Sequence, residues 1–299
     1  MTDTATTVPA AEQPRRVLPA AASYLPFLPA VVLLGGFFLI PLGIIVCYSF
    51  WQVIDYNVVH RWTLDNYHYF FIATAYVRTM WATLWVSLVA TAISLALAFP
   101  FAYWLSRYVP RRLRPLLLVL VVVPFWTSYL LRVYSWLTIL GEKGLLNRLL
   151  QWLGVTHHPI GLFLYDRSAV ILVLVYLYFP FAALTLYASL ERFDWNQFRA
   201  AMDLGATPAT AVWRILLPQI RPGFTTAVIF VFIPILGEYL TPQLVGGAKG
   251  VMIGNLIVNF FQGAQYTRGA AAALLIAGLI VILLAIFRRS LEVEDPYGT

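Results

Sequence analysis

Two charged side chains inside apolar runs are the residues of this sequence best placed to do chemistry. Glu238 follows the short apolar run 224–236, and Arg132 lies toward one end of the run 115–139. A charge in such surroundings is costly unless it faces a partner or a cavity. Either the two side chains pair with each other as a structural tie, or they line a path for a polar solute.

A carboxylate among aromatic rings suits an organic cation, because the faces of the rings attract positive charge. Aromatic residues are frequent near both charged residues, so the second possibility predicts that Glu238 meets a cationic substrate. The candidate residues for this path are Glu238, Tyr239, Trp126, Tyr134, Trp136 and Arg132.

Other kinds of chemistry have little support in the sequence. The phosphate-binding pattern GxxxxGK[ST] does not occur, and in LVGGAKG the glycines lie too close to the lysine. His157 and His158 would need further ligands to hold a metal, and the sequence does not indicate them. No spacing of Ser, His and Asp suggests a hydrolase. We therefore expect this chain to have no enzymatic activity, no bound cofactor and no metal.

The composition is that of a membrane protein. Hydrophobic residues make up 61% of the 299 residues and charged residues 11%, and the mean hydropathy is +0.78. Runs of about 20 apolar residues cross a bilayer, where the backbone must satisfy its own hydrogen bonds, and this favours helices. The sequence predicts an all-α integral membrane protein with about six spans, at 26–51, 77–106, 115–139, 168–190, 224–244 and 269–287.

Prolines and the single cysteine add two constraints on these spans. Prolines within the runs are expected to kink the helices without ending them, because neighbouring groups satisfy the freed carbonyls. These are Pro41, Pro100, Pro124, Pro180 and Pro234. Cys47 is the only cysteine, which excludes an intrachain disulfide and a Cys-rich metal site.

The basic residues lie at the ends of the apolar runs. A net charge of +7 could suggest a nucleic-acid partner, but this distribution indicates the cytoplasmic membrane surface instead. With the N-terminus inside, most of them are cytoplasmic, and RYVPRRLR (107–114) is the densest patch. Both termini are then cytoplasmic. The predicted organisation is a tail at 1–24, a transmembrane domain at 25–290 and a tail at 291–299.

The outer connections differ in character. Segments 52–76 and 141–167 contain apolar residues at helical spacing, which predicts short helices along the outer surface. The Gly-rich segment 241–269 is still apolar, and we expect it to pack into protein or to line a cavity.

One cytoplasmic segment, 191–222, has the signals of two capped helices. Asp194 can cap a first helix, and Gly205 stands just past its end, where a left-handed residue is needed. Thr207 and Pro208 can start a second helix, which Pro218 is expected to terminate. Small residues would leave one surface smooth: Ala200, Ala201, Ala206, Ala209 and Ala211. The segment is either an ordinary solvated connector or, as the caps favour, a surface that docks to a partner.

This segment resembles the EAA loop of binding-protein-dependent ABC importer permeases of the type I architecture. That loop reads Glu-Ala-Ala, three residues, Gly, nine residues, Ile, one residue, Leu-Pro. All the spacings fit, and only the first residue departs, being arginine. The resemblance implies a coupling role toward a separate ATPase subunit for Arg199, Ala200, Ala201, Asp203, Gly205, Ile215, Leu217 and Pro218.

The resemblance extends over about residues 25–290 and is closest to the spermidine/putrescine branch, in particular its B-type permease. The segments PFWTSYLLRVYSWLTILGEKGLLN, YFPFAALTLYASLERFD and LGEYLTPQLVGGAKGVMIGNLI carry it. It implies a polyamine importer in the bacterial inner membrane.

The partners implied are a homologous second permease chain, two ATPase subunits that hold ATP and magnesium, and an extracytoplasmic binding protein. The alternatives are the same architecture with another cargo (an opine, a phosphonate, an amino-acid derivative or ferric iron) or an ion-coupled secondary transporter.

Overall fold

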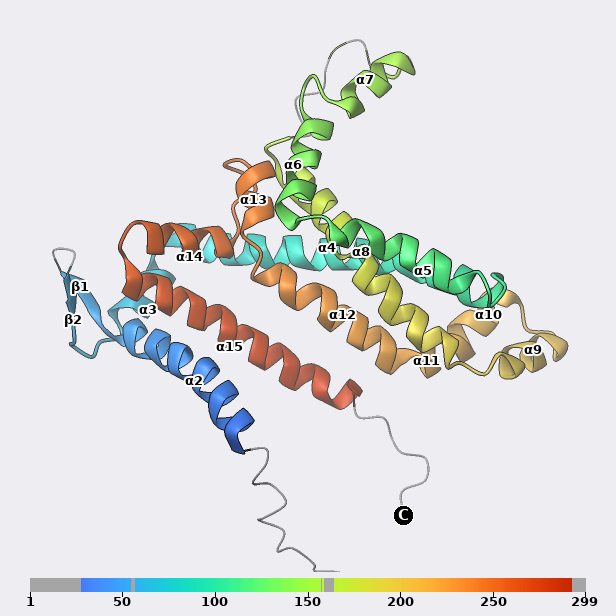
Figure 1. The fold of residues 1–299 in the computed structure, drawn as a ribbon, viewed down its shortest axis with the longest axis horizontal. Coiled ribbons are helices and arrows are strands. Elements are labelled where there is room, and N and C mark those ends of the chain that lie inside the picture. Colours follow the sequence, from blue (N-terminus) through green and yellow to red (C-terminus); the bar gives the residue numbers. More distant parts are fainter. Residues whose placement is uncertain (1–27, 55–56, 157, 159–163, 292–299) are drawn as a thin grey trace, which may run out of the picture. The chain divides into compact units, whose positions relative to one another are not determined.

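The computed structural model describes residues 28–54, 57–156, 158 and 164–291, which divide between two compact units, 1–45 and 46–299. The first unit contains most of α2 (Leu28–Phe50), whose segment Val31–Phe50 is apolar enough to span a membrane. The second unit contains all other helices and strands (Figure 1). The predicted tails at 1–24 and 292–299 lie outside the described residues.

Three helices form the centre of the second unit. In it α4 (Thr74–Arg107) packs along α8 (Arg167–Glu191), and α12 (Arg221–Leu236) packs against both. Fully buried alanines lie where these helices meet, among them Ala90, Ala98 and Ala182. Small residues suit this place, because helices in lipid associate through close packing rather than through the hydrophobic effect. The last helix, α15 (Tyr266–Leu291), packs against α12 and α14 (Ile253–Gln262).

Four helices in the described residues are long and apolar enough to cross a membrane, or up to six spans if each of two bent helix pairs is one span. The expected span at 115–139 is not continuous, contrary to the prediction. It consists of α5 (Arg114–Val122), the short turn η2 (Val123–Trp126) and α6 (Tyr129–Leu140), with a bend of 89°. Pro124 lies in η2, and the helix ends there because the chain becomes extended at Thr127.

The expected span at 224–244 is also wrong at one end. Helix α12 ends at Leu236, and α13 (Leu240–Val245) begins after a break. Of the prolines, Pro41, Pro100, Pro180 and Pro234 lie inside continuous helices, as predicted. Only Pro124 marks a helix end instead of a kink.

Short elements precede and connect the long helices. Strands β1 (Gln52–Ile54) and β2 (Asn57–Val59) form an antiparallel hairpin that the sequence did not indicate, with Val53 opposite Val58. The short helices expected in 52–76 and 141–167 are present as α3 (Asp65–Ile72) and α7 (Leu145–Trp152). Asp166 caps the start of α8, and the backbone hydrogen bond that it accepts from Ser168 lowers the pKa of its carboxyl.

Candidate functional site

The segment 191–222 folds into capped helices joined by a tight turn, as its sequence predicts. Helix α9 (Trp195–Asp203) begins where the Asp194 carboxylate accepts the N–H of Asn196, at 2.9 Å. Gly205, whose φ is +90°, lies two residues past its end. The N–H of Gly205 bonds to the carbonyl of Met202, and that of Ala206 to the carbonyl of Ala201, which is the hydrogen-bond pattern of a left-handed helix end.

The second helix starts as predicted but continues further. The Thr207 hydroxyl accepts the N–H of Thr210 at 3.2 Å, with Pro208 at the first helical position of α10 (Pro208–Ala211). A π-helical turn, η4 (Val212–Leu216), and α11 (Leu217–Gln219) follow. Pro218 therefore does not end the helix, contrary to the prediction. The wide turn places it in the first turn of α11, where no N–H is required of it, and the chain bends by 73° only before α12.

The alanines do not form one exposed surface, so that prediction is wrong. Ala200 and Ala209 are exposed, Ala201 and Ala206 are half-buried, and Ala211 is completely buried. The exposed stripe of α9 consists instead of Asn196, Arg199, Ala200, Asp203 and the residue after the helix, Leu204. Leu204 is 89% exposed.

The other predicted coupling residues divide between surface and core. Pro218 is exposed, whereas Ile215 and Leu217 are half-buried and pack against the main apolar core. The half-buried pair joins the loop to the transmembrane helices. The exposed residues are those that a partner could contact.

Aromatic residues attach α9 to the end of α4. The Arg107 guanidinium lies 5.2 Å from the ring centroid of Trp195 and 5.9 Å from that of Phe198. Trp195 also meets Tyr103 edge-on, and Phe198 is buried. The sequence signal for this contact is DWNQF (194–198), which places two aromatic residues at helical spacing, and it was not used in the predictions above. These contacts join the start of α9 to the end of α4.

The Glu238 carboxylate caps α13. One oxygen accepts the N–H groups of Tyr239, Leu240 and Thr241 at 3.1, 3.0 and 3.3 Å, and the other accepts the hydroxyl of Tyr178 at 3.4 Å. Thr241 in turn contacts the hydroxyl of Tyr129 at 2.7 Å. Neither expectation for Glu238 included this capping role, which explains why α12 and α13 are separate helices.

Arg132 does not pair with Glu238, so the structural tie between them is wrong. No ion pair within 4 Å joins the two among the described residues. The Arg132 guanidinium stacks instead 4.4 Å from the ring centroid of Phe125 and 5.6 Å from that of Tyr129. Its Nε is buried and lacks a hydrogen-bond partner in the described part of the chain. Tyr129 therefore contacts both Arg132 and Thr241, and the N–H of Thr241 is one of those that Glu238 accepts.

The remaining predicted path residues are dispersed. Trp126 is 83% exposed, Tyr134 and Tyr239 are partly exposed, and Trp136 packs edge-on against Tyr176. The residues that do gather around Glu238 are Tyr129, Tyr178 and Thr241, which nothing in the sequence singled out. Of the two histidines considered as metal ligands, His157 lies outside the described residues.

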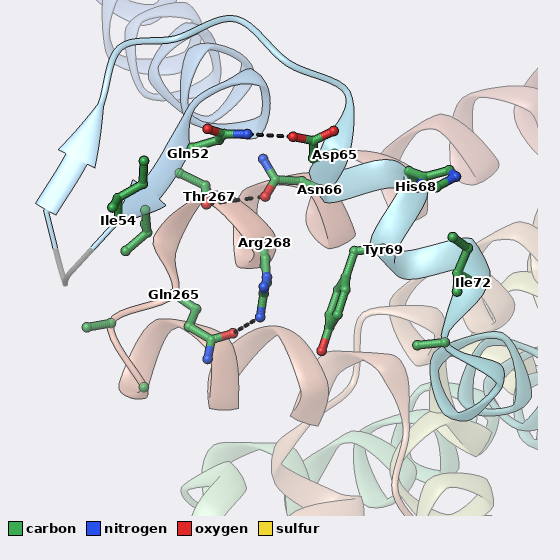
Figure 2. A pocket seen from close by; sticks show the side chains of 14 residues that line it. Gln52, Ile54, Asp65, Asn66, His68, Tyr69, Ile72, Gln265, Thr267 and Arg268 are labelled. Atoms are coloured by element: carbon green, nitrogen blue, oxygen red, sulfur yellow. Dashed lines mark hydrogen bonds between the residues drawn. The ribbon is translucent and has the colours of Figure 1, made fainter.

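A cavity of about 820 Å³ lies at the end of α4 opposite Arg107 (Figure 2). It is formed by β1, α3 and the turn before α15. Arg268 lies 4.0 Å from the ring centroid of Tyr69 and donates to the Gln265 side chain at 3.0 Å. Asp65 accepts a hydrogen bond from Gln52 across the cavity. No residue of this cavity was among the predicted site residues.

Comparison with known proteins gives consistent relatives. Residues 98–293 match the family described as binding-protein-dependent transport system inner membrane component. The spermidine/putrescine transport system permease protein PotB of Salmonella typhimurium is 39% identical over 188 residues, which are 62% of this chain and 65% of that protein. PotB of Haemophilus influenzae is 36% identical over 229 residues, or 76% of this chain and 79% of that protein.

The fold has a counterpart among solved structures. A chain of the bacterial alginate ABC transporter, in complex with alginate pentasaccharide-bound periplasmic protein, superposes with a TM-score of 0.72. The match covers 91% of this chain and 96% of that chain at 18% sequence identity. At this identity the likeness shows a shared fold, and it confirms the predicted fold class.

Proposed function

The chain belongs to the family of binding-protein-dependent transport system inner membrane components, and from this premise we propose that it is the permease subunit of an ATP-driven polyamine importer. In this role it carries out no bond chemistry. It provides a path across the membrane and alternates between inward-open and outward-open states, whose balance each ligand shifts by its differential affinity.

The observation that carries this proposal is the geometry of α9, Gly205 and α10. A solvated connector needs no caps on both helices and no Leu204 projecting from the turn between them. Such a turn is instead suited to seat in a cleft of another protein, because an exposed apolar side chain gains free energy when it is covered. The partner would be an ATPase subunit, which binds ATP and magnesium.

The same geometry supports the orientation of the chain. Arg107 places α9 beside the end of α4, next to the basic segment 107–114. Basic segments of this kind stay in the cytoplasm. The loop, the ATPase subunits and both termini are then cytoplasmic, and the cavity in Figure 2 is on the outer side, where a binding protein would deliver substrate.

The polyamine cargo rests on the two PotB relatives and on Glu238. Polyamines are flexible cations, which carboxylates and aromatic faces bind. Three backbone N–H groups hold one Glu238 oxygen in place, and the other faces Tyr178. A carboxylate fixed in this way at the break between α12 and α13 is positioned to meet a cation in the path.

Arg132 favours one alternative cargo. A guanidinium stacked on Phe125 and Tyr129, with no acidic partner among the described residues, would repel a polyamine but attract a solute that also carries a negative charge. An amino-acid derivative, an opine or a phosphonate has such a charge. Uptake competition between putrescine and these solutes distinguishes the two cargoes.

Two experiments test the proposal. Uptake of radiolabelled putrescine and spermidine should fall when the chain is deleted from a strain that lacks other polyamine importers. An ATPase subunit and a second permease chain should copurify with the chain in mild detergent. Transport that survives ATP depletion, with no ATPase copurifying, would instead indicate an ion-coupled transporter.

A further inference from the structure

A small charged pocket lies beside the exposed stripe of α9. Its volume is about 410 Å³, and its walls come from the segment after α4, the end of α8 and the start of α9. The charged and polar side chains that line it are Ser106, Arg111, Arg114, Arg199, Glu191, Asp194 and Asn196. Arg199 is the residue that departs from the EAA pattern.

The acidic side chains of this pocket already have partners. The Glu191 carboxylate accepts the hydroxyl of Tyr187 at 2.9 Å, and the Asp194 carboxylate caps α9. Arg114 is engaged as well, because it donates to the backbone carbonyls of Val109 and Ser106. Arg114 thereby fixes the segment after α4, whereas the contacts of Glu191 and Asp194 lie within α8 and at the start of α9.

Two arginines retain unused donors. Arg199 uses one nitrogen, which donates to the Asn196 side chain at 3.0 Å. Arg111 is exposed and makes no hydrogen bond or ion pair with any described residue. A guanidinium has five N–H donors in a planar fork, and it binds a carboxylate through two parallel hydrogen bonds. The pocket thus has a surplus of positive charge and of donors.

We propose that this pocket binds an acidic side chain of the ATPase subunit, with Arg199 and Arg111 as its partners. The inference rests on the proposed function and adds to it the charge of the contact. Arg199, at the first position of the EAA pattern, would then require an acidic residue on the ATPase subunit. A glutamate at the same position of the loop would instead require a basic residue on the ATPase subunit.

A protein partner fits this pocket better than an anionic lipid. Asp203 lies one turn from Arg199 on the same exposed stripe, and its negative charge would be repelled by an anionic membrane surface. Leu204 follows directly and is 89% exposed. A partner that bound at the pocket could therefore also cover this apolar side chain. A single docking surface can supply both the carboxylate and the cover.

The test measures the affinity of the purified ATPase subunit for the full-length permease complex in nanodiscs. Arg199→Glu should weaken this affinity by about tenfold or more, because it places two carboxylates together, and Arg111→Glu should also weaken it. Arg112→Glu is the matched control. Arg112 is an exposed neighbour that does not line the pocket, and its reversal should leave the affinity unchanged.

A reciprocal exchange identifies the partner residue. Acidic residues on the ATPase surface are changed to arginine one at a time, and one of these variants should restore the affinity for the Arg199→Glu permease. Arg199→Lys, which keeps the charge but not the fork, should give a smaller loss than Arg199→Glu. It also serves as the variant to use if Arg199→Glu inserts poorly.

Three results would overturn the inference or its premise. Equal affinities of the Arg199, Arg111 and Arg112 variants would refute the pocket while leaving the importer proposal intact. An effect of Arg199→Glu that appears only in nanodiscs with phosphatidylglycerol, and not in phosphatidylcholine alone, would assign the pocket to a lipid. Failure of any ATPase to bind the wild-type chain would refute the proposed function itself.

Discussion

Gly205 shows how one backbone angle supports the candidate coupling loop. Its φ of +90° closes the end of α9, and a Cβ built on it would meet no atom within 4 Å. The demand for glycine is therefore conformational and not steric. A residue with a Cβ pays roughly 1–2 kcal/mol in the left-handed region, and a β-branched residue is the least tolerated there.

The first prediction follows from this angle. Gly205→Val should uncouple ATP hydrolysis from uptake, because the turn and the projecting Leu204 shift, while the chain still inserts into the membrane. Gly205→Asn is the control, since asparagine tolerates the left-handed region, and it should retain most of the coupling. The ratio of uptake to ATP hydrolysis in proteoliposomes is the measurement, and a normal ratio for the valine variant would contradict the role of the turn.

Two substitutions of Glu238 can separate its capping of α13 from an effect of its charge on substrate binding. Glutamine retains a side-chain oxygen that can accept the N–H groups of α13 but has no charge, whereas alanine loses both. If the carboxylate meets a cationic cargo, Glu238→Gln should raise the substrate concentration needed for half-maximal uptake and leave the thermal stability almost unchanged. Glu238→Ala should lower both transport and stability, the latter by about 1 kcal/mol. If the uptake curves of Glu238→Gln match those of the wild type, the charge of Glu238 has no role in transport and only its capping of α13 remains.

At the scale of the elements, the approach of α8 to α12 depends on one glycine. A Cβ on Gly223, in the first turn of α12, would lie 1.7 Å from the hydroxyl oxygen of Ser189 on α8. The two helices could not keep this separation with any larger residue. This contact adjoins the bend that follows the candidate coupling loop, so the helices that carry the loop meet here.

A substitution at this contact should lower the stability, and a second substitution on the facing helix should partly restore it. Gly223→Ala should lower the free energy of unfolding by about 1–3 kcal/mol through overpacking. Ser189→Gly removes the side chain that would clash, and in the double variant it should restore part of the loss. The unfolding midpoint of the purified protein in detergent measures the effect. A Gly223→Ala protein as stable as the wild type would show that α12 can shift away at no cost.

The elements also explain where the predicted spans failed. Pro124 and Glu238 both lie where a long apolar run breaks into two helices, and at Pro124 the bend is 89°. Hydrophobicity extends across each break, so the apolar pattern could not show it. At Glu238 the break depends on a carboxylate that accepts hydrogen bonds from the first N–H groups of α13. The hydrophobic pattern of a sequence does not show such a contact.

At the scale of the whole molecule, the described helices place the candidate coupling loop and the cavity of Figure 2 at opposite ends of α4. The importer proposal requires that these two ends lie on opposite sides of the membrane. A cysteine introduced at Leu204, in a Cys47→Ser background and in cells that lack the ATPase subunit, should react with a membrane-impermeant maleimide only in inverted vesicles. A cysteine at the exposed Trp152 should react only in spheroplasts. Labelling of both from the same side would contradict the topology.

The sequence by itself determined the membrane class, the helical fold, the caps at Asp194 and Thr207 and the turn at Gly205. These depend on composition, on residue spacing and on local backbone preference, which neighbouring residues fix without help from distant ones.

Tertiary structure alone decided that Arg132 and Glu238 do not pair, that Tyr129 and Tyr178 surround Glu238, and that Arg199 shares a pocket with Arg111. Each of these statements concerns side chains from parts of the chain that are far apart in the sequence. The distances between them depend on how α4, α6, α8 and α12 pack, and nearly uniform apolar runs carry too little pattern to specify that packing.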